Sequence, residues 1–542
     1  MFGQLRSFVM NHIKIDPERI IGDIDRNIFG GTMEIGYSDS RYDYLNIGDS
    51  PSADKNGLRK DVRKALERIN LANIRFPGGN FASGYRWQDG VGPREERPTR
   101  YDLAFRCVVP NQYGTNEFIR FCRAMNIEPY LTVNCGDAEM REASDWVEYC
   151  NGTGDTAPVK LRREHGFDKS HKVKYWGIGN EVDSPGQIGY KTPQEYARAI
   201  TEFSKVMKRV DPGIKLIASG VCSWEDSPLS PQFLYRPTEW VERIQLMLEQ
   251  AGDRIDYISI HRYTYPHEDD PFEDYMAFAA DLDERLSAYE GLIRAVSLER
   301  GIRHDIGIAV DEWFAMRLPA QLSGDAPINI AADEWGVLRL TESKRVSPFR
   351  RDWQKGINLE AALATALYLN TYLRHANSVR IANFCAPMPM SLGLEGRHHD
   401  SPVLLPTIFY PFELFSRTCG QLALDVFWYG DTFSGNFKNR AYNGIRTLDV
   451  TATLDKERQQ LAVFVINQSK DNAMETTITL TTGQFMGNVQ VSVVNGPDVH
   501  AENTVEKPNQ VGVRKSTLKV SGQSFTYAFE PHSVTVLVCP IS

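Results

Sequence analysis

The sequence predicts a (β/α)8 TIM barrel followed by a C-terminal antiparallel β-sandwich. Three observations support this prediction. The chain has 542 residues, enough for two large domains. Over most of its length, short β-branched or aromatic runs alternate with amphipathic helical stretches, as in βα units that build a parallel sheet. After about residue 420, strands follow one another directly between Gly, Asn and Asp turns, and helical periodicity stops.

Eight runs of strand character precede residue 420, and eight parallel strands close a barrel of this class. They lie at 27–36, 73–79, 128–136, 172–181, 214–220, 255–264, 306–314 and 378–385. Amphipathic stretches lie at 55–70, 115–126, 192–210, 234–251, 273–301, 356–376 and 407–417. We therefore expect the barrel to span residues 25–419.

The C-terminal segment alternates apolar and polar residues, as half-buried strands do. The alternation is clearest at 459–468, 474–482, 488–495 and 524–539. We expect a β-sandwich over residues 420–542. The strand-like IKIDPERIIGDI at 13–24 comes before the first barrel strand, and we expect the N-terminal segment 1–24 to join the sandwich.

Charge and cysteine content narrow the range of partners. The 61 Lys and Arg against 70 Asp and Glu give a formal charge of −9, which disfavours nucleic acid and anionic membranes as ligands. The eight cysteines are scattered, so we interpret them as free thiols. Neither a signal peptide nor a membrane-spanning run is visible, so a cytoplasmic location is expected.

Polar side chains close several predicted strands. The active site of a TIM barrel lies at the carboxyl ends of its strands, so these residues are candidates for chemistry. They are Glu34 on the first strand, Arg75 and Asn80 at the second, Asn134 at the third, Asn180 and Glu181 at the fourth, His261 and Tyr263 at the sixth, and Asp311 and Glu312 at the seventh.

Glu181 and Glu312 suit cleavage of a glycosidic bond. One carboxyl group protonates the leaving oxygen, and the second meets the oxocarbenium-like carbon. Glu312 must stay ionised, with Arg75 and Tyr263 as hydrogen-bond donors. Glu181 must hold a proton near neutral pH, which burial beside Trp176 and the charge of Glu312 favour. The alternative is two structural ion pairs in a barrel without activity.

Six motifs are specific in combination. They are NIRFPGGNFASGYRWQDGVGPREERP (73–98), YGTNEFIRFCRAMNIEP (113–129), WGIGNEVDSPGQIGYKTPQEYA (176–197), DYISIHRY (256–263), DEWF (311–314) and LPTIFYPFELFSR (405–417). From about residue 13 onward the sequence resembles the α-L-arabinofuranosidases of glycoside hydrolase family 51. The resemblance implies a jelly-roll-like sandwich, exo-acting hydrolysis with retention of configuration, no metal or other cofactor, and frequent assembly into trimers or hexamers.

The resemblance also assigns roles. Glu181 in GNE resembles the acid/base, and Glu312 in DEW resembles the nucleophile. The other assignments are Asn180 to the sugar 2-hydroxyl, Glu34 to ring hydroxyls, Asn80 to the exocyclic hydroxymethyl group, Arg75 and Tyr263 to orientation of the nucleophile, His261 to the surroundings of the acid/base, and Phe105 and Trp313 to further substrate contact.

The pocket wall departs from the family pattern. Gly186 and Phe105 stand where the family has tryptophans, and Ala386 stands where a glutamine binds the primary hydroxyl of arabinofuranose. Ile35 and Phe314 replace a histidine and an asparagine. The catalytic pair is thus intact while the wall around it differs.

These departures leave a second sugar open. The smaller residues Ala386 and Gly186 open volume where β-D-galactofuranose carries an extra hydroxymethyl group. A β-D-galactofuranosidase is therefore an alternative, unless loops such as 391–402 refill the space. A remoter alternative is a non-catalytic carbohydrate-binding barrel, which needs no paired acid and nucleophile.

The expected partners are a furanoside-containing oligosaccharide or polysaccharide and other copies of the chain, with no nucleic acid and no membrane. No metal or cofactor is expected. We interpret His398, His399 and Asp400 as solvated or substrate-rim residues rather than metal ligands. The PGG at 77–79 lacks phosphate-loop spacing, and its glycines are interpreted as permitting close backbone approach at the barrel rim.

Overall fold

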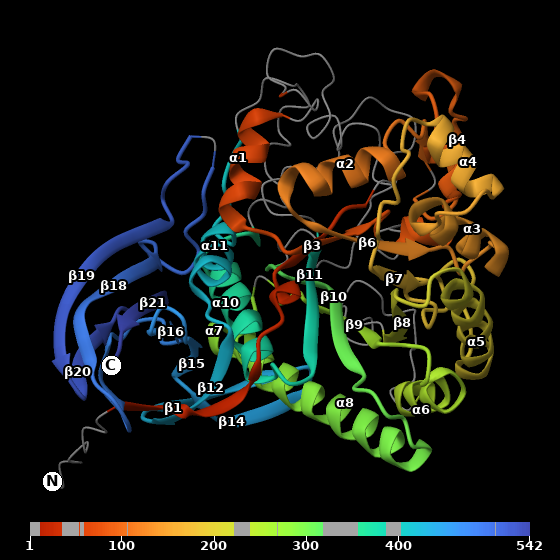
Figure 1. Ribbon diagram of the computed structural model, residues 1–542. Helices are drawn as coiled ribbons and strands as arrows, with labels where there is room; N and C mark the ends of the chain where they lie inside the picture. Colours follow the sequence, from red (N-terminus) through yellow and green to blue (C-terminus); the bar gives the residue numbers. More distant parts are fainter. Residues whose placement is uncertain are drawn as a thin grey trace, which may run out of the picture.

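Eight parallel strands close into a barrel, which lies at the centre and right of Figure 1. In order around the barrel they are β2 (Gly30–Thr32), β3 (Asn73–Phe76), β6 (Glu128–Val133), β7 (Tyr175–Ile178), β8 (Lys215–Val221), β9 (Tyr257–Thr264), β10 (Gly307–Ala315) and β11 (Val379–Cys385). Each overlaps one predicted run, and the predicted barrel is confirmed. The computed structural model describes residues 11–34, 54, 59–105, 107–221, 239–267, 269–317, 356–385, 403–504 and 506–542.

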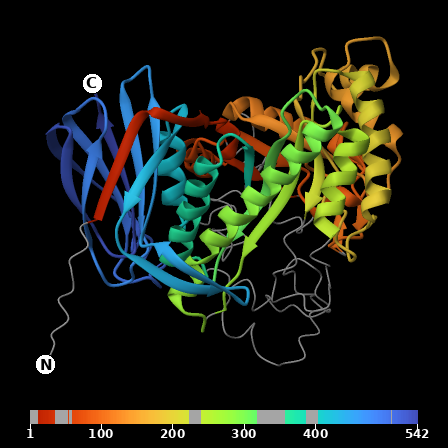
Figure 2. The same cartoon turned by 90° about the horizontal axis from the view of Figure 1, so that it is seen from below.

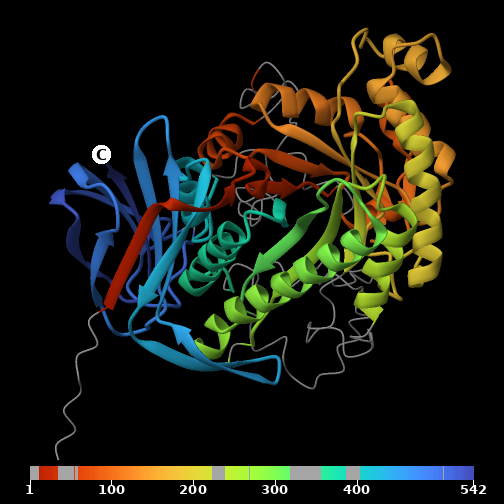
Figure 3. The ribbon, with the colours of Figure 1, turned by 60° about the horizontal axis from the view of Figure 1, so that its bottom comes forward.

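Helices cover the outside of the barrel (Figure 3). They are α1 (Lys60–Ile69), α2 (Thr115–Met125), α3 (Met140–Asn151), α4 (Ala157–Glu164), α5 (Pro193–Val210), α6 (Glu239–Ala251), α7 (Phe272–Met276), α8 (Phe278–Arg300), α10 (Leu359–Arg374) and α11 (Phe409–Thr418). Thr192 and Glu195 form a capping box that starts α5. The predicted stretch 273–301 divides into α7 and α8, while α3 and α4 lie outside the predicted stretches. No helix among the described residues is long and apolar enough to cross a membrane.

Short elements connect β3 to α2. They are the 3-10 helices η2 (Asn80–Ser83), η3 (Trp87–Gly90) and η4 (Arg94–Glu96) and the hairpin of β4 (Arg100–Asp102) and β5 (Cys107–Val109); η1 (Arg26–Ile28) precedes β2. Because this connection starts at the carboxyl end of β3, η2 lies at the end of the barrel where the candidate residues gather.

A nine-stranded sheet forms the second domain, blue with one red strand in Figure 1. Its order is β19–β18–β21–β16–β15–β12–β1–β17–β20. The strands are β1 (Asn11–Asp23), β12 (Leu422–Tyr429), β15 (Leu448–Asp455), β16 (Gln460–Asn467), β17 (Met474–Leu480), β18 (Phe485–Asn495), β19 (Gly512–Gly522), β20 (Ser524–Phe529) and β21 (Ser533–Pro540). Among these described strands, β1 and β17 run parallel and the other neighbours antiparallel. Ile13, Val463 and Leu537 lie in its own apolar core, and the predicted sandwich is confirmed.

The sandwich packs on the barrel through α10 and α11, the teal helices between the two domains in Figure 2. α10 is buried on almost all sides because barrel strands and sandwich strands enclose it. Phe415 of α11 stacks on Phe464 of β16 with ring centroids 4.2 Å apart. Arg374 of α10 pairs with Asp449 of β15 at 2.9 Å. The interface is therefore apolar with a charged edge.

A hairpin of β13 (Thr432–Phe437) and β14 (Arg440–Arg446) leaves the sandwich and reaches α7 and α8 (Figure 3). The backbone N–H of Asn436 donates to Asp274 of α7 at 2.7 Å. Tyr442 donates to the buried Asp281 of α8 at 2.9 Å. The C-terminal domain thus contacts the barrel at a second place.

Candidate active site

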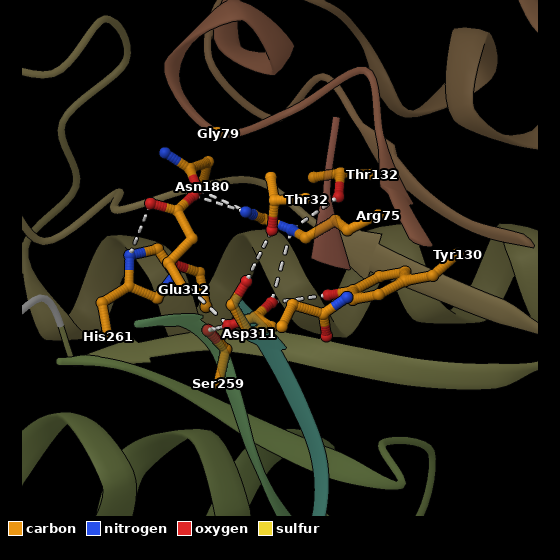
Figure 4. A network of polar contacts seen from close by, with 12 residues as sticks. Thr32, Arg75, Gly79, Tyr130, Thr132, Asn180, Ser259, His261, Asp311 and Glu312 are labelled. Atoms are coloured by element: carbon orange, nitrogen blue, oxygen red, sulfur yellow. Dashed lines mark hydrogen bonds and ion pairs between the residues drawn. The ribbon is translucent and has the colours of Figure 1, made fainter. Parts of the chain in front are cut away.

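Both carboxylate oxygens of Glu312 on β10 accept hydrogen bonds. Arg75 of β3 donates from Nη1 to Oε1 at 2.5 Å, and the hydroxyl of Tyr263 of β9 donates to Oε2 at 2.5 Å. Glu312 itself is 2% exposed. A guanidinium and a phenol stabilise the ionised form of a buried carboxylate. Glu312 is therefore held as an oriented anion (Figure 4).

Glu181 follows β7 in a left-handed backbone conformation. Its φ is 42°, two residues after Gly179 with φ 77°. Such a φ is uncommon for a residue with a side chain, and strained backbone concentrates at functional sites. The carboxyl group of Glu181 meets the imidazole of His261 from β9, with Oε1 and Nδ1 2.5 Å apart.

The pKa values of Glu181 and His261 are both raised above their usual values. Burial raises the pKa of Glu181 to about 8; His261 opposes this rise, while the charges of Glu312 and Asp183 add to it. Burial alone lowers the pKa of His261, but the charges of Glu312 and Glu181 raise it well above its usual value. A carboxyl group that keeps a proton near pH 7 is suited to act as a general acid.

Asp311 orients His261 from the side opposite to Glu181. One of its oxygens lies 3.3 Å from Nε2 of His261 and also accepts from the hydroxyl of Ser259. The other oxygen accepts from the hydroxyl of Tyr130 at 2.7 Å. A carboxylate on Nε2 holds the ring so that Nδ1 faces Glu181.

Arg75 connects the nucleophile candidate to two predicted sugar contacts. Its Nη2 donates to Asn180 at 2.7 Å, and its Nε donates to Thr132 at 3.1 Å. Asn180 donates in turn to Asn80 at 3.2 Å. Burial alone raises the pKa of Asp311, but the charge of Arg75, with the nearby imidazole, holds it well below its usual range. One buried guanidinium thus organises the carboxylates of β10 and two amide side chains.

Glu34 lies against the PGG motif. Its Oε1 accepts from the backbone N–H groups of Gly79 at 2.9 Å and Phe81 at 3.1 Å. Burial raises the pKa of Glu34 to about 8, and the charge of Glu312 adds to the rise. A Cβ on Gly78 or Gly79 would lie 2.4 Å from the Glu34 side chain or the Glu312 carboxylate, respectively. Close backbone approach, the interpretation given to these glycines, is confirmed.

Glu181, His261 and Glu312 gather tightly. One oxygen of each carboxyl group and one imidazole nitrogen lie within 4.8 Å of one another. Among the described residues this is the cluster whose spacing suits a cation. Its oxygens already hydrogen-bond to His261, Arg75 and Tyr263, so we interpret the cluster as acid–base machinery.

Known proteins match the chain along almost its whole length. Residues 65–278 match the Alpha-L-arabinofuranosidase 1 domain, and residues 333–533 match the Alpha-L-arabinofuranosidase C-terminal domain. The intracellular exo-α-(1→5)-L-arabinofuranosidase 1 of Bacillus subtilis is 31% identical over 537 residues, which cover 96% of this chain and 97% of that protein. The family 51 α-L-arabinofuranosidase of Thermotoga petrophila aligns with a TM-score of 0.79 and 31% identity, over 97% of this chain and 99% of that one. The chain belongs to glycoside hydrolase family 51.

A further family structure agrees with this placement. The α-L-arabinofuranosidase of Thermotoga maritima, solved as an arabinose complex, has a TM-score of 0.78 and 31% identity, over 97% of this chain and 99% of that one. The family 51 resemblance of the sequence motifs is thereby confirmed, and so is the assignment to the glycoside hydrolases.

Two predicted substrate contacts of this family 51 chain lie apart from the paired glutamates. Trp313 is fully buried and packs on Tyr368 of α10 and Phe384 of β11, with ring centroids 5.0 and 4.7 Å away. Phe105, between β4 and β5, is 8% exposed and packs in the apolar core. The described contacts do not bring either ring to Glu181 or Glu312.

Trp176 also faces away from the site. Its indole packs on Trp146 of α3, with ring centroids 5.7 Å apart. Its neighbour Tyr175 packs with Tyr130 inside the barrel. Alternate strand residues face opposite sides, so Trp176 packs on the outer face of β7, and its described ring contacts do not include Glu181.

Sequence reasoning missed the supports of the site. Tyr130, Thr132 and Ser259 contact Asp311 or Arg75, and no role was predicted for them. Their spacing in the sequence indicates this role: Tyr130 and Thr132 are two residues apart on one strand, and Ser259 is two residues before His261. Side chains two apart on a strand share a face.

Some of the pocket-wall residues that differ from the family pattern lie outside the described residues. Gly186 is exposed on the connection after β7. Phe314 packs on Phe384 with ring centroids 5.1 Å apart. Ile35, Ala386, His398, His399, Asp400 and the loop 391–402 lie outside the described residues.

Proposed function

We propose that this chain is a retaining exo-glycoside hydrolase that releases terminal non-reducing α-L-arabinofuranosyl residues from arabinose-containing oligosaccharides and polysaccharides. One observation carries the proposal: oxygens of Glu181 and Glu312 lie within 4.8 Å of each other. Retaining enzymes separate their carboxyl groups by roughly 5–5.5 Å and inverting enzymes by roughly 6.5–9.5 Å. The activities named for the relatives supply the sugar.

In the first step Glu312 attacks the anomeric carbon while Glu181 gives its proton to the glycosidic oxygen. The carbon–oxygen bond to the leaving group breaks as the ester bond to Glu312 forms. Arg75 and Tyr263 hold Glu312 ionised and aimed before the attack. His261 keeps the acid in place through its contact with Oε1.

In the second step Glu181, now ionised, takes a proton from water, and this water attacks the anomeric carbon. Glu312 departs as a carboxylate, and two inversions give net retention. Glu34, Asn180 and Asn80 are the proposed sugar contacts, since they converge with Gly79 and the guanidinium beside the nucleophile. The scheme uses no cofactor.

A pair of variants tests the roles. Glu312→Ala should lower turnover of nitrophenyl α-L-arabinofuranoside by roughly a thousandfold or more. Azide should restore product as a glycosyl azide of inverted configuration. Glu181→Ala with azide should give the retained azide, because the nucleophile is still present. Near-normal turnover of Glu312→Ala, or the same azide anomer from both variants, would contradict the assignment.

The sugar is tested by comparing rates on nitrophenyl α-L-arabinofuranoside and nitrophenyl β-D-galactofuranoside. The relatives named above are arabinofuranosidases, and they give the galactofuranoside alternative no support. We expect the arabinoside to be preferred. A tenfold preference for the galactoside, about 1.4 kcal/mol in transition-state binding, would reverse the choice.

Location and assembly complete the proposal. Two bacterial relatives are named intracellular enzymes, and we propose the same compartment for this chain. Assembly into a trimer or hexamer stays a prediction from the family resemblance. Light scattering during size-exclusion chromatography should give the mass of such an assembly, and a monomer mass would contradict it.

A further inference from the structure

Side chains from both neighbouring barrel strands approach Glu312. Its strand, β10, lies between β9 and β11. Tyr263 comes from β9, and Cys385 is the last residue of β11. The hydroxyl oxygen of Tyr263 lies 2.5 Å from Oε2 of Glu312 and 3.3 Å from Sγ of Cys385. The phenol oxygen therefore contacts both the carboxylate and the thiol.

The number of protons decides the direction of these two hydrogen bonds. A phenol has one proton to donate, and an anionic carboxylate is a stronger acceptor than a sulfur atom. The proton of Tyr263 therefore points to Glu312, and the phenol oxygen is left to accept. Within the described part of the chain, Tyr263 is the hydrogen-bond partner of the Cys385 thiol.

The thiol keeps its own proton. Burial raises the pKa of Cys385 well above its usual value, and the charges of Glu312 and Glu34 add to the rise, while Tyr263 and Arg75 oppose it. A protonated thiol is a hydrogen-bond donor, although a weak one. Cys385 is thus a neutral donor beside the oxygen of Tyr263.

We propose that Cys385 is a positioning residue for the nucleophile: its thiol donates to the hydroxyl oxygen of Tyr263 and makes that phenol a stronger donor to Glu312. Hydrogen bonds in a chain polarise one another, by roughly 10–30% per bond. The inference rests on the proposed role of Glu312 as nucleophile.

The effect belongs mainly to the second step of the reaction. Glu312 carries more negative charge when it departs as a carboxylate than when it is an ester, and a stronger donor stabilises the charged form. Loss of the thiol should therefore slow release of the sugar more than its capture. With a dinitrophenyl arabinofuranoside, whose good leaving group makes release rate-limiting, kcat and KM should fall together and kcat/KM should stay constant.

Three variants test this inference by kinetics. Cys385→Ala should lower kcat about two- to threefold, as expected when one hydrogen bond to a charged group is weakened by roughly 10–30%, and Cys385→Ser should keep the kcat of the unaltered protein because a hydroxyl still donates. In a Tyr263→Phe background, Cys385→Ala should have no further effect. Cys107→Ala, a half-buried thiol on the β4–β5 hairpin, is the control and should not change kcat. An equal loss in Cys385→Ser, or additive losses in the double variant, would overturn the proposal.

An infrared measurement tests the hydrogen bond without using activity. Subtracting the spectrum of Cys385→Ala from that of the unaltered protein isolates the S–H stretch of Cys385. The band should lie at lower frequency than the one isolated in the same way in Tyr263→Phe. If the enzyme is active and the band is not shifted, the thiol does not donate to Tyr263, and the proposal is overturned. A shifted band in a protein without furanosidase activity would contradict the proposed function instead.

Discussion

The backbone of Gly79 lies directly against Glu312. A Cβ at this glycine would fall 2.4 Å from Oε1 of Glu312 and 3.4 Å from the amide nitrogen of Asn180. Oε1 is also the oxygen that accepts from Arg75. A side chain here would therefore push the carboxylate away from the guanidinium, so the contact itself requires glycine.

The variant Gly79→Ala should lower kcat by about a hundredfold, because a displacement of about 1 Å at reacting groups costs that much. Its thermal unfolding midpoint should change little, since the added methyl group displaces a carboxylate rather than core packing. Gly84→Ala is the matched control, because a Cβ there meets nothing within 4 Å. Equal kcat values in the two variants would show that the contact between Gly79 and Glu312 does not affect the rate.

The pH dependence of kcat/KM should report Glu181. Because the pKa of Glu181 is raised to about 8, the acid is protonated below that pH and activity should fall as the pH rises through about 8. His261 opposes the rise in this pKa. His261→Gln should therefore move the basic limb to higher pH and lower the maximal rate. If the basic limb of the pH profile does not move in His261→Gln, the role of His261 is contradicted. The control is His304→Gln, because His304 is exposed.

Stability should depend on pH through His375 at the end of α10. It contacts Glu290 at 2.8 Å and Asp283 at 3.4 Å. Burial alone lowers the pKa of His375, but these two carboxylates raise it to about 9. A folded-state pKa above the usual 6.5 means that the protonated ring stabilises the fold. This stabilisation is complete below about pH 6.5 and is lost as the pH rises through about 9, on the order of 3 kcal/mol.

Urea unfolding between pH 6 and 10 checks the prediction. The free energy of unfolding of the unaltered protein should decline over this range more steeply than that of His375→Asn. At pH 10 the two proteins should differ least. Parallel curves for the two proteins would exclude His375 as the source of the decline.

The barrel strands and the glutamate pair could be predicted because they follow from local pattern. Strands of a parallel sheet are buried on both faces and read as apolar runs, so polar residues at their ends stand out. Glu181 and Glu312 are such residues. Their placement at one end of the barrel then follows from the parallel order of the strands.

Side-chain directions on β10 could not be predicted in this way. Asp311 and Glu312 are neighbours, and neighbours on a regular strand face opposite sides. The pairing of β10 with β9 shifts register between Ala309 and Glu312, and irregularities of this kind redirect side chains. Both carboxyl groups can therefore approach His261, at 3.3 and 3.6 Å. Trp313 instead packs outside, and sequence spacing does not reveal such a shift.

Asp281 of α8 links the C-terminal domain to the strand that carries His261 and Tyr263. It accepts from Tyr442 of the β13–β14 hairpin at 2.9 Å and pairs with Arg262 of β9. Arg262 lies between the two site residues in sequence but packs outside the barrel, over the ring of Phe437. The hairpin thus supports the outer face of the strand that carries His261 and Tyr263.

The variant Tyr442→Phe should therefore lower the free energy of unfolding by about 1 kcal/mol, the net value of one buried hydrogen bond. Asp281 keeps its ion pair with Arg262, so kcat/KM should stay within about twofold. Tyr429→Phe is the control because Tyr429 is 58% exposed, and it should leave the free energy of unfolding unchanged. Urea unfolding of both variants decides the point. The two changes remove the same hydroxyl group. If Tyr442→Phe lowers the free energy of unfolding no more than Tyr429→Phe does, the hydrogen bond to Asp281 does not stabilise the fold, and the hairpin contributes only buried surface.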